Sequence, residues 1–333
     1  MRRDHRTVGL MVGLPLMLLI VFGYAARFDV PDVDTKVMGA NAVGFASSLP
    51  EPFEVSEVNP DGDAGEARSQ LRDSEAGVVF VTSTEGGAVM FVDGIELFVA
   101  QSALRNLPDG ARPEVLFNPQ LETSTVMVPA LIGFVLLFVG TVVTSLGVVR
   151  EREQGTLEQL AVMPLRPVDV AVGKLVPYFV VAAVDMVVIT VVGLLLFDMP
   201  FEGSLVLFAL FGLVFLFVVL GLGVAISTLS SSQGEAIQLA IMTLLPQIML
   251  SGMIFPLDSM PTVIRWIGYC LPLTWFVEAM RAILVKGTSL DALAVPLLIL
   301  AAMALAVSAL ALSRFRRELA PKQRDHAATS GAS

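Results

Sequence analysis

Six apolar runs, each close in length to a transmembrane helix, constrain the fold of this chain more than any other feature. They occupy residues 8–26, 126–149, 175–197, 204–229, 236–255 and 290–312. A helix needs about 20 predominantly apolar residues to cross a bilayer. Only 16% of the 333 residues are charged, against roughly 25% in soluble domains. The sequence therefore predicts a polytopic α-helical membrane protein with six transmembrane helices.

Basic residues predict which polar segments lie in the cytoplasm. They gather before the first run, between the second and third runs, and after the last run (Arg2, Arg3, Arg6; Arg150, Arg152, Arg166, Lys174; Arg314, Arg316, Arg317, Lys322, Arg324). Cytoplasmic loops carry an excess of Lys and Arg. Both termini are therefore expected in the cytoplasm of a cell with the protein in its plasma or inner membrane. Residues 1–26 form the N-terminus and first helix, and residues 314–333 form a cytoplasmic tail.

The polar block between the first two runs, residues 27–122, is expected outside the cell membrane. It contains six Lys and Arg against seventeen Asp and Glu, and it accounts for the net charge of −10. Period-two apolar patterns predict strands at 53–58, 77–82, 88–92 and 113–117, and helical patterns cover 64–74 and 95–106. We expect a small α/β or α+β external domain between helices 1 and 2. An acidic block gives no expectation of a nucleic-acid partner.

The first run also fits a cleavable signal peptide, because it has a basic start and a small-x-small pattern at Gly23-Tyr24-Ala25. Its length favours a retained helix. The predicted orientation is the same in both cases.

A polar segment between the second and third runs, residues 151–163, predicts a short amphipathic helix in the cytoplasm. Thr156 and Gln159 have the spacing of a capping box, Leu157, Leu160 and Ala161 recur on one helical face, and Pro164 ends the pattern. Such a helix is suited to docking a partner.

These residues also carry a resemblance. The pattern E-R-E-x-G-T-x-E-x-L-x-x-x-P over 151–164 resembles the coupling helix of type-2 ATP-binding-cassette (ABC) transporter permeases. Residues 256–287, with S-G-x-x-F-P before them and P-L-T within, resemble the re-entrant external helices of that family. The V-D-G at 92–94 and F-N-P at 117–119 resemble signatures of its drug- and lipid-exporting branch, with Phe for the usual Tyr. Asp-Gly and Asn-Pro are also ordinary turn formers, and we do not interpret them as ligands.

The resemblance implies an exporter with two permease subunits, either two copies or a pair of paralogues, and two ABC ATPase subunits. It implies that residues 123–313 hold transmembrane helices 2–6, and that ATP hydrolysis is coupled through residues of the cytoplasmic helix (Glu151, Arg152, Glu153, Gly155, Thr156, Glu158, Leu160, Pro164). No phosphate loop G-x-x-x-x-G-K-[ST] occurs, so ATP and Mg are expected on the partner ATPase and no cofactor on this chain.

Catalytic and metal chemistry find little support in the sequence. Cys270 is the only cysteine, and His5 and His326 lie in opposite tails. No nucleophile and base, and no cluster of metal ligands, can be argued from so few residues. We expect a permease rather than an enzyme.

Three charged residues near or within the apolar runs are candidates for the transport path. Asp185 lies in the middle of the third run, where an ionisable group costs about 2.5–3.5 kcal/mol on insertion scales. Glu278 and Arg281 can pair at i and i+3 on one helical face. For Asp185 a hydrogen bond to a neighbouring helix is an equal alternative, and for Glu278 and Arg281 a local ion pair is favoured.

Two other classes of function remain open. An ion-coupled carrier would use Asp185 as its proton site, and a membrane-anchored adaptor or enzyme would work through the external domain. If the protein is an exporter, we expect its substrates to be amphipathic drugs or lipids, and we expect membrane lipid as a further partner.

Overall fold

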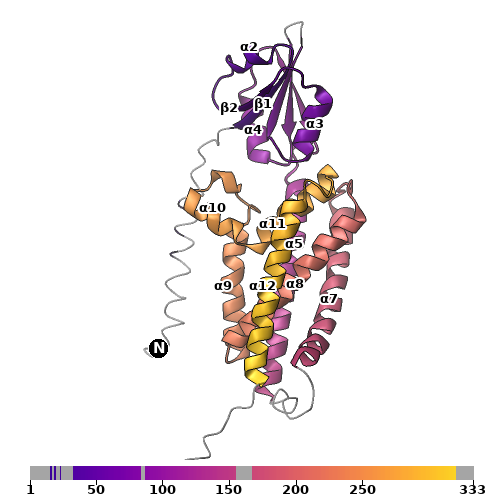
Figure 1. The fold of residues 1–333 in the computed structure, drawn as a ribbon, viewed down its shortest axis with the longest axis vertical. Coiled ribbons are helices and arrows are strands. Elements are labelled where there is room, and N and C mark those ends of the chain that lie inside the picture. The colour runs from indigo at the N-terminus through magenta and orange to yellow at the C-terminus, as the bar shows by residue number, and fades with distance from the viewer. Residues whose placement is uncertain are drawn as a thin grey trace, which may run out of the picture.

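The computed structural model describes residues 33–83, 87–154 and 167–319, together with Leu16, Leu19 and Gly23. Within these ranges, a sheet domain stands at one end of a bundle of long helices (Figure 1). Most of the predicted first run, the segment 155–166 and the residues from 320 onwards lie outside the described part of the chain.

The sheet domain, residues 33–116, contains a five-stranded sheet in the order β2-β1-β3-β4-β5. Its strands are β1 Val33–Gly39, β2 Phe53–Asn59, β3 Val78–Thr82, β4 Ala88–Asp93 and β5 Ala111–Leu116. Strand β1 runs parallel to β2 and β3, β4 runs antiparallel to β3, and β5 runs parallel to β4. The start of β1 and the ends of β4 and β5 therefore lie at the same edge, which faces the bundle (Figure 1).

Helices cover both faces of this sheet. Helix α3 (Ala64–Arg72) packs with alternate residues of β3 and β4, including Val79 and Phe91. Helices α2 (Ala42–Ala46) and α4 (Leu97–Arg105) pack with the intervening residues on the other face, including Phe80 and Met90. The four predicted strands and two predicted helices are confirmed, whereas β1 and α2 were not predicted.

Five long helices form the described bundle: α5 Thr123–Glu153, α7 Pro167–Leu196, α8 Leu205–Leu229, α9 Gln233–Leu250 and α12 Ala294–Leu319. Four segments are long and apolar enough to span a membrane: α5, Leu175–Leu196 of α7, α8 and Ala294–Ala311 of α12. A fifth candidate is the bent segment, in which α10 (Thr262–Tyr269) and the pair α11 (Pro272–Arg281) and η2 (Ala282–Lys286) meet at 81°. The predicted count of six is not confirmed, since the described residues give four or five.

Helix α9 is shorter than the predicted run 236–255. It ends at Leu250, and Gly252 then takes a positive φ of 76°, which turns the chain away from the helical path. A short 3-10 turn, Leu257–Ser259, leads into α10.

Helix α8 lies at the centre of the bundle and uses glycine to bring its neighbours close. A Cβ atom at Gly212 would collide with Met186 of α7, one at Gly221 would lie 2.6 Å from Val307 of α12, and one at Gly223 would lie 2.7 Å from Thr144 of α5. These three glycines are therefore close-packing sites between helices.

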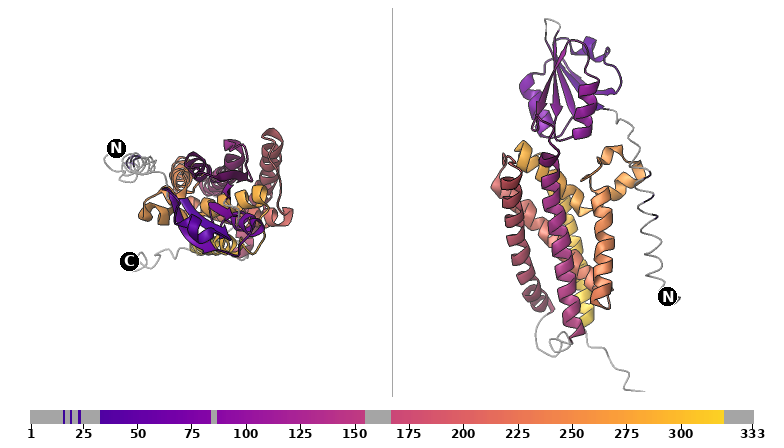
Figure 2. Two further views of the ribbon diagram at one scale, coloured as in Figure 1. Left: turned by 90° about the horizontal axis from the view of Figure 1, so that it is seen from above. Right: turned by 180° about the vertical axis from the view of Figure 1, so that it is seen from behind.

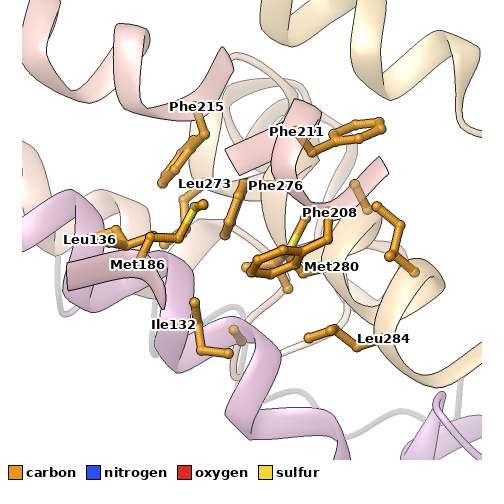
Figure 3. Close-up of a cluster of buried hydrophobic side chains, with 14 of the residues drawn as sticks. Ile132, Leu136, Met186, Phe208, Phe211, Phe215, Leu273, Phe276, Met280 and Leu284 are labelled. Atoms are coloured by element: carbon orange, nitrogen blue, oxygen red, sulfur yellow. The ribbon is translucent and has the colours of Figure 1, made fainter. Parts of the chain in front are cut away.

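Helix α11 of the bent segment packs into the bundle core at the end nearer the sheet domain (Figure 1). Leu273, Phe276 and Met280 of α11 are fully buried, and they meet Phe208, Phe211 and Phe215 of α8 beside Ile132 and Leu136 of α5 (Figure 3). Phe276 stacks on Phe215 with ring centroids 4.1 Å apart. A shift of α11 therefore has to be accompanied by repacking of α5 and α8.

Candidate functional site

The strongest cluster of charges lies where the sheet domain meets the bundle. Lys286, at the end of η2, places its Nζ atom 2.5 Å from Oδ2 of Asp93, at the end of β4. The two side chains are only 4% and 1% exposed. The same ammonium group donates to the Leu71 carbonyl at 3.1 Å and to Oγ of Ser74 at 2.7 Å. Removing either charge would leave the other buried without its counter-charge.

The two short sequence motifs of this domain come together at the same place. The V-D-G motif lies at the end of β4, and the F-N-P motif follows β5. Because β4 and β5 are parallel, both motifs lie at the same end of the strands. The Asn118 amide donates to the Gly94 carbonyl at 3.1 Å and to the Glu122 carbonyl at 3.0 Å, while its Oδ1 accepts from the Glu122 amide at 2.9 Å. Asn118 thereby fixes the start of α5 against the sheet.

Turn chemistry explains part of the V-D-G motif. Oδ1 of Asp93 accepts from the Ile95 amide at 2.9 Å, as expected of an aspartate in a turn. A Cβ atom at Gly94 would lie 2.7 Å from the Asn118 carbonyl oxygen and 2.8 Å from that of Leu116, so only glycine fits there. The second oxygen of Asp93 contacts Lys286, and this contact was not predicted from the sequence. The sequence signal that could have indicated it was a lysine at the end of an apolar helical segment.

Arg281 belongs to the same region. Its guanidinium donates to three backbone carbonyls, of Val126 at 3.1 Å, Gly252 at 3.1 Å and Met253 at 3.2 Å. The planar fork of arginine thus joins the start of α5 to the loop after α9. Of the predicted transport-path candidates, Arg281 therefore lies in this contact, and Glu278 lies exposed one turn earlier on α11.

The opposite end of the bundle is organised by the last turn of α5. Arg152 donates to the carbonyls of Ser230 at 2.9 Å and Ser227 at 3.0 Å, at the end of α8. Glu153 accepts from the amide and the side chain of Gln233, at 3.2 and 2.5 Å, in the first turn of α9. A cation thus meets a helix C-terminus and an anion meets a helix N-terminus, which matches both helix dipoles.

Helix α9 also has a capping box of its own. Oγ of Ser232 accepts from the Glu235 amide at 3.3 Å, and the Glu235 carboxylate accepts from the Ser231 amide at 2.7 Å. The start of α9 is therefore held both locally and by α5.

The remaining predicted residues are placed less fully. Gly155, Thr156, Glu158, Leu160 and Pro164 lie outside the described residues, whereas Glu151 lies in the final turn of α5. Asp185 is half-buried on α7, between the outward-facing Val184 and Val188 and next to the buried Met186. Within the described ranges there is no group of three His, Cys, Asp or Glu side chains that could hold a metal ion.

The long apolar helices, the bent segment in the core and the polar turn joining α5, α8 and α9 agree with one family across the chain. The model of the ABC-2 family transporter proteins matches residues 5–313. The chain belongs to the ABC-2 transporter family. The resemblance to type-2 ABC permeases is thereby confirmed.

Three relatives of the chain are described as permeases. The chain is 26% identical to the probable multidrug ABC transporter permease YbhS of Escherichia coli (strain K12), over 95% of this chain and 94% of that protein. It is 35% identical to the probable multidrug ABC transporter permease YbhR of the same strain, over 53% of this chain and 48% of that protein. It is 34% identical to the inner membrane transport permease YhhJ, over 61% of this chain and 54% of that protein.

Proposed function

We propose that this ABC-2 protein is the membrane-spanning permease subunit of an ATP-driven exporter for amphipathic drugs or lipids, powered by separate ATPase subunits. The observation that carries the proposal is the match to YbhS, a probable multidrug ABC transporter permease, over nearly the full length of both chains. A substrate class of this kind suits an apolar bundle, since such a path selects by size and amphipathicity rather than by particular hydrogen bonds.

The working complex in this proposal contains two permease subunits and two ATPase subunits, and the ATPases bind ATP and Mg. The chain crosses the membrane six times, with both termini in the cytoplasm, the sheet domain outside, and the bent segment re-entering from the outer face. The ATPase docks on the cytoplasmic segment 151–163, whose first three residues close α5 instead of starting a separate helix. The fixed position of Arg152 and Glu153 against α8 and α9 supports this, because a force on residues 155–166 would reach three helices at once.

Reconstitution tests the proposal. Affinity-tagged protein is purified from its native membrane, the co-purifying ATPase is identified, and both are placed in vesicles loaded with a fluorescent phospholipid or a lipophilic dye. We expect movement of the probe that requires ATP and stops when the phosphate-loop lysine of the ATPase is replaced. Movement driven by a proton gradient alone, with no ATPase in the preparation, would contradict the proposal.

Asp185 separates the exporter from an ion-coupled carrier. In an exporter, Asp185→Asn is expected to keep ATP-driven transport within about twofold, because an amide can make the hydrogen bond to a neighbouring helix that we propose for the carboxylate, whereas Asp185→Leu lowers assembly or transport. The measurement is ATP-driven uptake in vesicles containing equal amounts of each variant. If Asp185→Asn stopped transport while the assembled complex still hydrolysed ATP, Asp185 would belong to the transport chemistry. The comparisons favour neither the carrier nor an adaptor.

A further inference from the structure

Two buried contacts join the sheet domain to the end of the bent segment. The first is the Asp93–Lys286 ion pair, extended by the hydrogen bonds of Lys286 to Leu71 and Ser74. The second is a hydrogen bond of 2.9 Å from Oγ1 of Thr288 to the Arg72 carbonyl. Leu71 and Arg72 lie in the last turn of α3, so these donors bind carbonyls at the C-terminal end of that helix, where the Leu71 carbonyl also accepts from the Ser74 amide at 3.3 Å.

The backbone at Lys286 is held as firmly as its side chain. Residues Ala282–Lys286 form a π-helical turn, and such turns are rare and concentrate at functional sites. Gly287 ends this turn with a positive φ of 65°. The Glu202 amide donates to the Leu284 carbonyl at 2.9 Å, which ties the turn to the connection between α7 and α8. Lys286 is therefore presented to Asp93 by a fixed element.

We propose that the sheet domain and the bent segment move as one rigid body during transport, with the Asp93–Lys286 pair and the Thr288 contact as the joint. Opening the joint would separate two desolvated charges, which is unfavourable compared with moving the two parts together. Because Phe276 and Met280 lie in the bundle core, a shift of α11 would then tilt the sheet domain above it (Figures 1 and 3).

A distance measurement tests the joint without any transport assay. In a Cys270→Ser background, spin labels are placed at Val43→Cys on α2, far from the joint, and at Leu290→Cys just after it, since both side chains are exposed. In nanodiscs we expect one narrow distance distribution, which the Lys286→Met substitution broadens. The double variant Asp93→Asn with Lys286→Met removes both charges, and it replaces the single variant in this measurement if the single variant folds poorly. Both variants keep the Thr288 contact, but the double variant has no unpaired buried carboxylate, so we expect a distribution narrower than in Lys286→Met.

The matched control is Lys36→Met. Lys36 pairs with Glu57 at 2.9 Å and with Glu75 at 3.6 Å, entirely inside the sheet domain. We expect this substitution to leave the distribution narrow. Two separated populations in the unsubstituted protein, or an equally narrow distribution in Lys286→Met, would overturn the proposal.

A cross-link tests whether the joint opens during the cycle, and this arm rests on the proposed function. Arg72→Cys and Ser289→Cys place exposed thiols on either side of the Thr288 contact. A cleavable bifunctional thiol reagent is expected to leave ATP-driven transport within about twofold. If the cross-link stops transport and cleavage restores it, the joint opens and the proposal is wrong. If the untreated protein shows no ATP-driven transport, the proposed function fails and the distance measurement still decides on the joint.

Discussion

At the scale of single residues, buried and half-buried cations of this chain donate to backbone carbonyls near segment ends. Arg152 serves the end of α8, Lys286 serves the end of α3, and Arg281 serves the loop after α9. The last carbonyls of a helix have no amide four residues further along to bind. Each of these cations therefore connects segments that are far apart in the sequence.

The Asp93–Lys286 pair is expected to show strong non-additivity. Lys286→Met alone leaves a buried carboxylate without its counter-charge and is expected to cost about 3–5 kcal/mol. Adding Asp93→Asn to it is expected to recover most of this loss, since Asn keeps the hydrogen bond from the Ile95 amide. Thermal unfolding followed by circular dichroism in detergent gives the double-mutant cycle.

The comparison pair for this cycle is Lys36 with Glu57. Burial lowers the pKa of Lys36, but the hydrogen bond and charge of Glu57, together with Glu75, outweigh burial and leave that pKa raised. Both glutamates are about half exposed, so this pair is expected to contribute less than about 1 kcal/mol. Equal, additive losses in the two cycles would contradict the assignment of Asp93–Lys286 as the joint.

Arg281 is expected to resist replacement by lysine. An ammonium group cannot reproduce the fork that serves Val126, Gly252 and Met253 together. We expect Arg281→Lys to lower the melting temperature of the bundle clearly, and Arg68→Lys at the exposed contact with Glu114 to leave it nearly unchanged. Differential scanning fluorimetry in detergent compares the two variants, and equal melting temperatures would refute the structural role of Arg281.

Residue pairs of this kind could not be predicted from the sequence alone. Asp93 was interpreted as a turn residue, and its Oδ1 atom confirms that interpretation. Its partner Lys286 lies in a different part of the chain, and no local pattern links the two. The same holds for Arg152 and Glu153, whose partners follow α8.

At the scale of elements, α5 connects the end of the bundle under the sheet domain with the polar contacts of Arg152 and Glu153 at the opposite end. This helix of 31 residues starts at the Asn118 turn under the sheet domain and ends at Arg152 and Glu153 (Figure 2). Gly133 allows α11 to approach it closely, since a Cβ atom there would lie 2.5 Å from the Phe276 ring. A displacement at either end of α5 therefore acts directly on the core.

Charge reversal at Glu153 is expected to loosen the start of α9. Glu153→Lys removes a cap and places a cation at a helix N-terminus, at a cost of about 1–2 kcal/mol. We expect faster hydrogen exchange at residues 233–236 by mass spectrometry, and ATP hydrolysis that continues while transport falls. Arg150→Glu, at an exposed position of the same helix, is the control. Unchanged exchange in Glu153→Lys would show that the cap is dispensable.

Elements were predictable where their periodicity was clear. Strands β2 to β5 and helices α3 and α4 follow alternating or helical patterns bounded by turn residues. Strand β1 also alternates, with Val33, Thr35 and Val37 buried and Asp34 exposed between them, but one of its three alternating buried positions is the polar Thr35, so its apolar pattern was too short to predict a strand. The predicted end of α9 was too late, because a hydropathy pattern does not show the turn at Gly252.

At the scale of the whole molecule, the described bundle leaves two helices largely uncovered, α7 and α12. Helix α7 has a row of exposed valines, with Val181, Val184 and Val188 each 53–55% exposed, and α12 exposes Leu298 and Leu305. Four or five candidate spans make a small bundle, and α11 of the bent segment packs into its core. A path for the amphipathic substrates that we propose would therefore require more than the described residues of one chain.

A complex with two permease copies is the expected smallest functional unit. Native mass spectrometry of protein released from nanodiscs is expected to give the mass of two chains, with the ATPase subunits when these are co-expressed. Mixing differently tagged chains before reconstitution tells two identical copies from one copy bound to a paralogue. Monomers that sustain ATP-driven transport would contradict this prediction.

The edge at which the chain enters and leaves the sheet domain also bears on how such proteins diversify. A unit inserted through one edge can be exchanged by recombination without altering the helices on either side. Here an exchange carries a condition, because Lys286 stays behind in the recipient. Chimaeras are therefore expected to be viable only when the incoming sheet domain has a carboxylate at the end of its fourth strand, where Asp93 lies here. The residues at positions 93 and 286 would therefore be inherited together.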